Sequence, residues 1–166
     1  MQNIQSSTIR HRCRILSRVN TTQPHPPDRR KSATTNYQES TKLAQDKTTQ
    51  CTKFLTFARF IHDQANFSVR SAGQHPSDED KDGFRGLEQQ WKDLLDNKLL
   101  DGTAGDVLTR TFLDEAQLEL SKLDGTDTAA TQARAAWQKV VSLVGECKEV
   151  SQEVEQVMAK MQSLLS

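Results

Sequence analysis

The sequence lacks any run of about 18 apolar residues, so we expect no membrane-spanning segment. No apolar segment follows its first residues, and we also expect no secretory signal. Aromatic residues make up only 5% of the chain and apolar residues 34%, which is low for a globular domain. This shortage predicts that part of the chain lies outside the folded core.

Cysteine is also scarce, since Cys13, Cys51 and Cys147 are the three present. Their odd number and wide spacing do not predict a disulfide framework or a zinc site. Cys51 and Cys147 fall on apolar helix positions, where cysteine acts as a small hydrophobic residue. We therefore expect a reducing, intracellular compartment, and the cytoplasm in particular.

Motifs for catalysis or cofactor binding are missing as well. The four histidines have no second ligand at metal-binding spacing, and there is no glycine-rich phosphate loop. No nucleophile and base can be brought together from the sequence. We therefore expect no enzyme activity, no catalytic residues, no cofactor and no metal.

Residues 1–36 differ in charge from the rest of the chain. They hold seven basic residues and one acidic residue, whereas residues 37–166 hold 15 basic and 21 acidic residues. Prolines at 24, 26 and 27 oppose regular structure, and the segment is rich in polar residues. We predict a disordered basic tail over residues 1–36. The alternative is a mitochondrial transit peptide, because the start is basic, poor in acids and amphipathic.

The most regular feature of the sequence lies in its last forty residues. Apolar positions there recur in alternating steps of three and four residues, which is the heptad pattern of a helix that packs against another helix. We call these positions the C-terminal seam: Ala130, Ala133, Trp137, Val140, Val144, Cys147, Ser151, Val154, Met158, Met161 and Leu165. Ser151 is its one polar member.

The same periodicity predicts four helices, over residues 38–69, 84–100, 106–123 and 127–165. The start of the first helix is polar and rich in threonine, so we expect it to be frayed. Its phenylalanines, which are expected to supply core volume rather than an aromatic binding surface, are Phe54, Phe57, Phe60 and Phe67. Short turns suggest that the second and third helices, and the third and fourth, are antiparallel neighbours. The fold class is therefore all-α, with residues 37–166 forming a four-helix bundle that has a long, coiled-coil-like C-terminal helix.

The acidic segment at residues 78–83 resembles the first half of an EF-hand calcium loop, with aspartates at alternate positions before Gly83. The resemblance covers six of twelve positions, and the twelfth is Gln89 instead of a bidentate glutamate. The alternative is an acidic loop whose carboxylates favour the positive end of the following helix. We prefer that alternative, and calcium binding stays untested by the sequence.

Helix lengths suggest a function. At ~1.5 Å per residue the last helix is roughly 55–60 Å long, so its second half is expected to project unless the first helix reaches it. An uncovered seam favours a non-enzymatic scaffold or adaptor that binds itself or a partner helix, as a homo-oligomer or a complex subunit. The expected partner-binding residues are Cys147, Val154, Met158, Met161 and Leu165. The alternative is a peripheral membrane or lipid-binding protein, which the acidic face of this helix disfavours. Without a basic helix face, we expect no nucleic-acid partner.

Overall fold

The computed structural model describes residues 29–100 and 102–166. Its elements are α1 (Arg29–Ala72), α2 (Asp78–Leu95), the short 3-10 helix η1 (Ala104–Leu108), α3 (Arg110–Ser121) and α4 (Thr128–Leu165). The predicted all-α class, the four helices and the long C-terminal helix are confirmed. Residues 1–28 of the predicted tail, including the possible transit peptide, lie outside the described residues.

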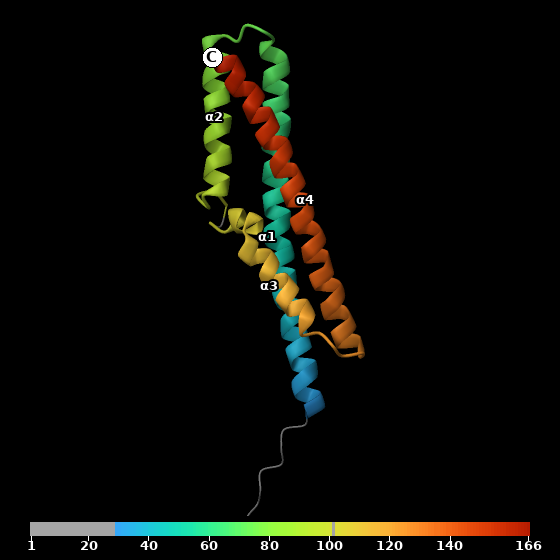
Figure 1. The fold of residues 1–166 in the computed structure, drawn as a ribbon. Helices are drawn as coiled ribbons and strands as arrows, with labels where there is room; N and C mark the ends of the chain where they lie inside the picture. Colours follow the sequence, from blue (N-terminus) through green and yellow to red (C-terminus); the bar gives the residue numbers. More distant parts are fainter. Residues whose placement is uncertain (1–28, 101) are drawn as a thin grey trace, which may run out of the picture.

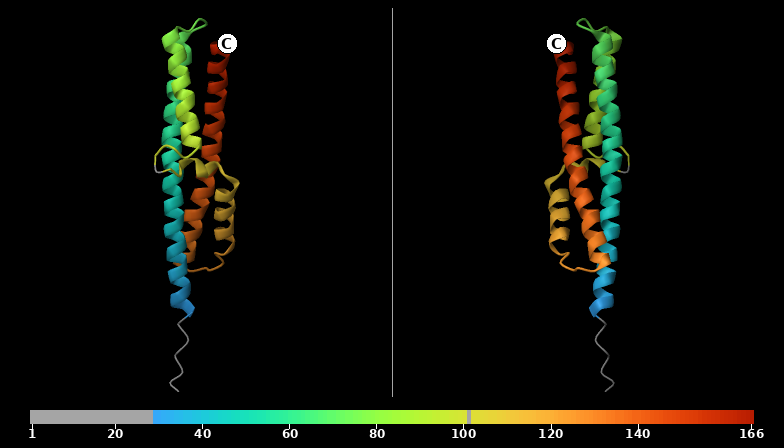
Figure 2. Two further views of the ribbon diagram at one scale, coloured as in Figure 1. Left: turned by 90° about the vertical axis from the view of Figure 1, so that its left-hand side faces the viewer. Right: turned by 90° about the vertical axis from the view of Figure 1, so that its right-hand side faces the viewer.

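The helices form an elongated bundle in which α1 and α4 run side by side in the same direction (Figure 1). The contact between these two helices is the most extensive in the structure. Together α2 and α3 supply the returning direction, with α2 beside the C-terminal half of α1 and α3 beside the N-terminal half of α4 (Figure 2). At each level the bundle therefore contains three helices, which are α1, α4 and either α2 or α3. The returning helix is interrupted between α2 and α3.

Of the two expected antiparallel pairs, α3 with α4 is present, but α2 and α3 are not neighbours of that kind. They follow each other along the same side of the α1–α4 pair (Figure 2). The reason is a close approach at Gly105. A Cβ on this residue would overlap the carbonyl oxygen of Leu95 and lie 2.9 Å from that of Leu94. The side chain of Asn97 also accepts from the Gly105 N–H at 2.6 Å and donates to Asp106 at 2.7 Å, which fixes the interruption.

The first helix begins at Arg29, not near residue 38, so residues 29–36 belong to α1 and not to the tail. The sequence offers no proline or glycine between Pro27 and Gly73 that would stop it. The threonines that suggested fraying are accommodated, because their hydroxyls bond to carbonyls four residues earlier, as Thr41 does with Tyr37 and Thr49 with Gln45. The expectation of a frayed start is wrong.

The second helix begins at Asp78, six residues earlier than expected, and ends at Leu95 rather than near residue 100. A capping box starts it, since the Ser77 hydroxyl accepts from the Asp80 N–H while the Asp80 carboxylate accepts from the Ser77 N–H. The sequence signal for the end at Leu95 is Asn97. This residue has φ of 57°, and asparagine adopts such positive values more readily than most residues.

The remaining boundaries also show where caps act. The predicted helix over residues 106–123 is divided into η1 and α3, because the Thr109 hydroxyl caps a new helix by accepting from the N–H of Phe112. The last helix agrees closely with the prediction. Its N-cap is Asp127, whose side chain accepts from the N–H of Ala130.

The C-terminal seam forms much of the core. Every member from Ala130 to Met161 is buried, and Leu165 is half-buried. The second half of α4 does not project, because α1 extends to Ala72 and covers it, with α2 on the other side (Figure 1). The seam is therefore satisfied within the chain.

Candidate functional site

The residues expected to bind a partner lie inside this core. Cys147, Val154 and Met161 are fully buried, Met158 is 6% exposed, and Leu165 at the end of α4 is half-buried. In this arrangement the seam offers little surface to another protein. That these residues bind a partner stays a prediction.

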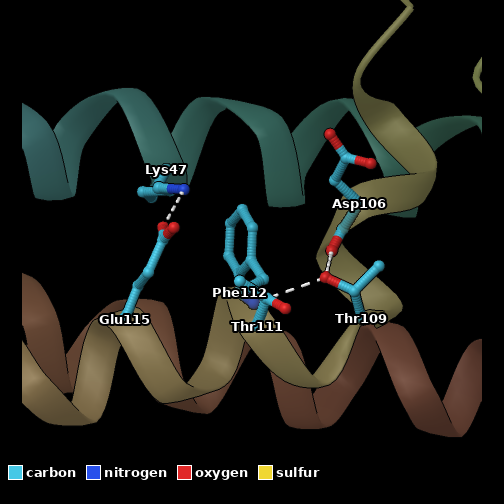
Figure 3. Close-up of a pocket in the computed structure, with 6 residues that line it drawn as sticks. All are labelled: Lys47, Asp106, Thr109, Thr111, Phe112 and Glu115. Atoms are coloured by element: carbon cyan, nitrogen blue, oxygen red, sulfur yellow. Dashed lines mark hydrogen bonds and ion pairs between the residues drawn. The ribbon is translucent and has the colours of Figure 1, made fainter.

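A hollow of about 300 Å³ lies between α1, η1 and α3, and its lining is drawn in Figure 3. The ammonium of Lys47 from α1 lies 2.7 Å from a carboxylate oxygen of Glu115 on α3 and 4.3 Å from the centre of the Phe112 ring. The Thr109 hydroxyl donates to the carbonyl of Asp106 at 2.7 Å and caps α3. These side chains join α1 to α3, and none of the six lining residues forms a nucleophile–base pair with another.

Metal binding is not supported by side-chain positions in the described part of the chain. No group of three or more His, Cys, Asp or Glu residues is placed there to hold a metal ion. The calcium-like segment is the first turn of α2 instead of a loop, and Asp82 pairs with Arg85 at 2.7 Å. Hydrogen bonds from the hydroxyl and then the N–H of Ser77 lower the pKa of Asp80. These aspartates therefore lie at a helix start, where the preferred alternative placed their charge, but inside α2 and not in a loop before it.

Membrane insertion as a span is likewise not indicated by the helices that are described. Among residues 29–100 and 102–166, none of the helices combines the length and the hydropathy needed to cross a bilayer.

The outer face of α1 carries the largest exposed apolar side chains that lie close together. Phe60 is 51% exposed and Phe67 is 68% exposed, one heptad apart on the same side of the helix. Phe57 is half-buried, and its ring centre lies 6.1 Å from that of Phe60. We call Phe57, Phe60 and Phe67 the aromatic strip.

The strip corrects an expectation about the core. Phe54 is fully buried and packs against Trp91 with ring centres 6.1 Å apart, as expected. Phe60 and Phe67 do not add to the core, because at 3.6 residues per turn they lie on nearly the opposite side of the helix from the buried Ala58 and Ala65. From the sequence, core packing was preferred over an exposed aromatic surface, but the structure exposes Phe60 and Phe67 and half-exposes Phe57.

Leu100 extends the apolar surface beside Phe57. It is 52% exposed, has φ of 60°, and lines a hollow of about 220 Å³ with Thr52, Lys53, Thr56 and Phe57. Positive φ is uncommon for a bulky residue. No local pattern in the sequence predicted the exposure or the positive φ of Leu100, because this residue was expected to end the second helix.

Comparison of the chain with models of protein families, with curated proteins and with solved structures gave no match. The function proposed for the chain is therefore inferred from its geometry.

Proposed function

We propose that the chain is a non-enzymatic helical scaffold that associates with a second copy of itself through the aromatic strip of α1. The observation that supports this proposal is the exposure of Phe60 and Phe67 on one helix face. Large apolar side chains that gather on a surface mark interaction sites more often than single ones do. Among the described residues, the exposed Leu100 lies beside Phe57, whereas the exposed Leu43 and Leu118 lie on α1 and α3 away from the strip.

A second copy suits the strip because the strip can be its own partner. In a two-fold dimer each surface contacts the same surface of the other copy, so residue i meets residue j and j meets i. If the two α1 helices pair in opposite directions, Phe60 of each copy meets Phe67 of the other. The same register places Phe57 opposite Arg70, where a guanidinium can lie over the aromatic ring.

Charge favours the opposite-direction register over the same-direction one. Pairing in the same direction would bring the exposed Asp63 near Asp63 of the other copy and Arg70 near Arg70. Like charges placed opposite each other are unfavourable in an interface. In the opposite-direction register Asp63 meets Gln64 instead.

The association is expected to be weak. Each exposed phenylalanine contributes roughly 100 Å² of apolar surface, so the strips bury only a few hundred Å² between them. Stable interfaces usually bury about 1,200–2,000 Å² in total. We therefore expect a monomer–dimer equilibrium that depends on concentration.

The proposal is tested by the solution mass of the full chain, measured by light scattering from roughly micromolar to roughly millimolar concentration. We expect the mass to rise toward that of a dimer, and Phe60→Asp with Phe67→Asp to keep the chain monomeric with unchanged helicity. The matched control is Leu118→Asp, which changes an exposed leucine on α3 and should associate like the wild type.

Two results would contradict the proposal. One is a wild-type chain that stays monomeric at every concentration, and the other is a double aspartate variant that dimerises as well as the wild type does. Binding of a monomeric wild type to vesicles of neutral or anionic lipid would support the peripheral-membrane alternative instead.

A further inference from the structure

Two thiols meet inside the core at the middle of the bundle. The Sγ of Cys147 on α4 lies 3.7 Å from the backbone carbonyl oxygen of Cys51 on α1, although the residues are 96 positions apart. Both residues are fully buried and neither takes part in a disulfide. The pair has no role in the proposed self-association, because it lies on the face of α1 opposite the aromatic strip.

The helix contact at this point is a close one. One series of buried residues in α1 recurs every seven positions and is small throughout: Ala44, Cys51, Ala58 and Ala65. A second buried series holds the larger Phe54 and Ile61. Small side chains allow helix axes to approach closely, and the contact of Cys147 Sγ with the α1 backbone shows that they do so here. Disulfides need Cα atoms about 4.4–6.8 Å apart, a separation that only closely packed helices provide.

The surroundings make the two sulfurs chemically unequal. A hydrogen bond from the Cys147 thiol lowers the pKa of Cys51, burial opposes this, and the charge of Lys47 adds to the lowering. The hydrogen bond to Cys51 and burial both raise the pKa of Cys147. A thiolate reacts faster than a thiol, so the directions of these shifts favour Cys51 as the attacking sulfur and Cys147 as its resolving partner.

We propose that Cys51 and Cys147 are an oxidation site, at which hydrogen peroxide joins the two sulfurs into a disulfide between α1 and α4 in the folded chain. The Cys51 thiolate attacks one peroxide oxygen, the O–O bond breaks, and the departing hydroxide takes up a proton to leave as water. Cys51 is then a sulfenic acid.

In the second step the Cys147 sulfur attacks the Cys51 sulfur. The S–S bond forms, the S–O bond breaks, and the leaving oxygen takes the Cys147 proton to depart as water. The two cysteines lose two electrons in all, and peroxide is reduced to two waters. Because both sulfurs are buried, the reaction proceeds through local openings of the α1–α4 contact.

The expected effect is a covalent tie between the two long helices. In a reducing compartment such a bond is transient and signals oxidation, instead of serving as permanent structure. This agrees with the absence of a disulfide framework in the sequence.

The test uses the full chain, treated with hydrogen peroxide under native conditions and digested with trypsin without reduction. We expect residues 48–53 joined to residues 140–148, a mass loss of two hydrogens, and a higher thermal midpoint that dithiothreitol reverses. Cys13→Ser should behave like the wild type, whereas Cys51→Ser and Cys147→Ser should each lose the cross-link. Dimedone should trap more sulfenic acid at Cys51 in Cys147→Ser than at Cys147 in Cys51→Ser.

The inference is overturned if the cross-link forms only after unfolding in guanidinium, or joins Cys13 to either cysteine. It is also overturned if no joined peptide appears while the helical signal of the treated chain stays intact.

Discussion

The indole nitrogen of Trp137 donates a hydrogen bond of 2.9 Å to the hydroxyl of Ser40, which lies 97 positions earlier in the chain. Trp137 is fully buried, so this bond satisfies its one polar group inside the core. It also ties the polar first half of α1 to α4. That part of α1 was expected to fray, and this contact is one reason that it does not.

Ser40→Ala is predicted to lower the free energy of unfolding by about 1–3 kcal/mol, because it leaves the buried Trp137 N–H without its partner. Urea denaturation followed by tryptophan fluorescence measures the loss. Thr49→Ala is the matched control, since its exposed hydroxyl bonds to a carbonyl of its own helix, and it should change stability little. Equal effects of the two variants would show that the Ser40–Trp137 bond does not support the core.

Val154→Asp combined with Met161→Asp is predicted to unfold the chain instead of merely preventing association. Both residues are fully buried, and an unpaired carboxylate there carries a large desolvation penalty. Circular dichroism should show a lost helical signal, while Glu155→Ala on the exposed side of α4 should keep it. A double variant that stays helical but loses self-association would identify the C-terminal seam as an intermolecular contact.

Two glycines are predicted to respond oppositely to alanine. Gly145 lies exposed within α4, where an added Cβ would have open space around it, so Gly145→Ala should raise the unfolding free energy by about 0.5–1 kcal/mol. Gly105→Ala should lower it, because the new methyl group would overlap the carbonyl of Leu95. Thermal denaturation of both variants gives the signs, and a destabilising Gly145→Ala or a neutral Gly105→Ala would contradict the structure.

The contribution of Asp80 is predicted to depend on pH. Its pKa is lowered from the ordinary value of 3.8 in the folded chain, so its carboxylate stabilises the fold above that value. The contribution is lost as the pH falls through the lower folded-state pKa. Asp80→Asn should therefore destabilise the chain at neutral pH, and the difference from the wild type should disappear in acid.

The control for this pH dependence is Asp78→Asn. Asp78 lies in the same first turn of α2 and shares its favourable position at the helix start, but it is outside the capping box with Ser77. If both variants show the same pH profile in denaturation experiments, the helix dipole and not the capping box accounts for the effect.

The sequence predicted the helices better than their arrangement. Periodicity identified α4 to within one residue of its start, together with the buried face that contains Trp137 and Met161. A heptad pattern states which face of a helix is buried, but not which helix covers it or in which direction. The parallel pairing of α1 with α4 was therefore not predictable from it.

The misplaced features depend on contacts between distant residues. The break between α2 and α3 requires the backbone at Gly105 to approach Leu95, which no local pattern reveals. The aromatic strip could have been found, because Phe60 and Phe67 fall outside the face defined by Ala58 and Ala65. The general expectation that scarce aromatic residues are buried outweighed that local signal.

The central proposal, self-association through the strip, predicts a distance between copies. With Phe60 opposite Phe67 of the other copy, two residues at position 64 lie within about 1.5 Å of the same level along the paired helices. Two residues at position 49 lie about 43 Å apart along the axis, although Thr49 is on the same exposed face of α1.

The most direct measurement is therefore disulfide cross-linking of Gln64→Cys and Thr49→Cys, each in a Cys13→Ser chain, followed by non-reducing electrophoresis. Pairing through the strip predicts a covalent dimer for Gln64→Cys and a monomer for Thr49→Cys under the same oxidation. Cross-linking of both variants to the same extent, or of Thr49→Cys alone, would contradict the two-fold pairing of α1, and a monomer in both cases would contradict association through the strip.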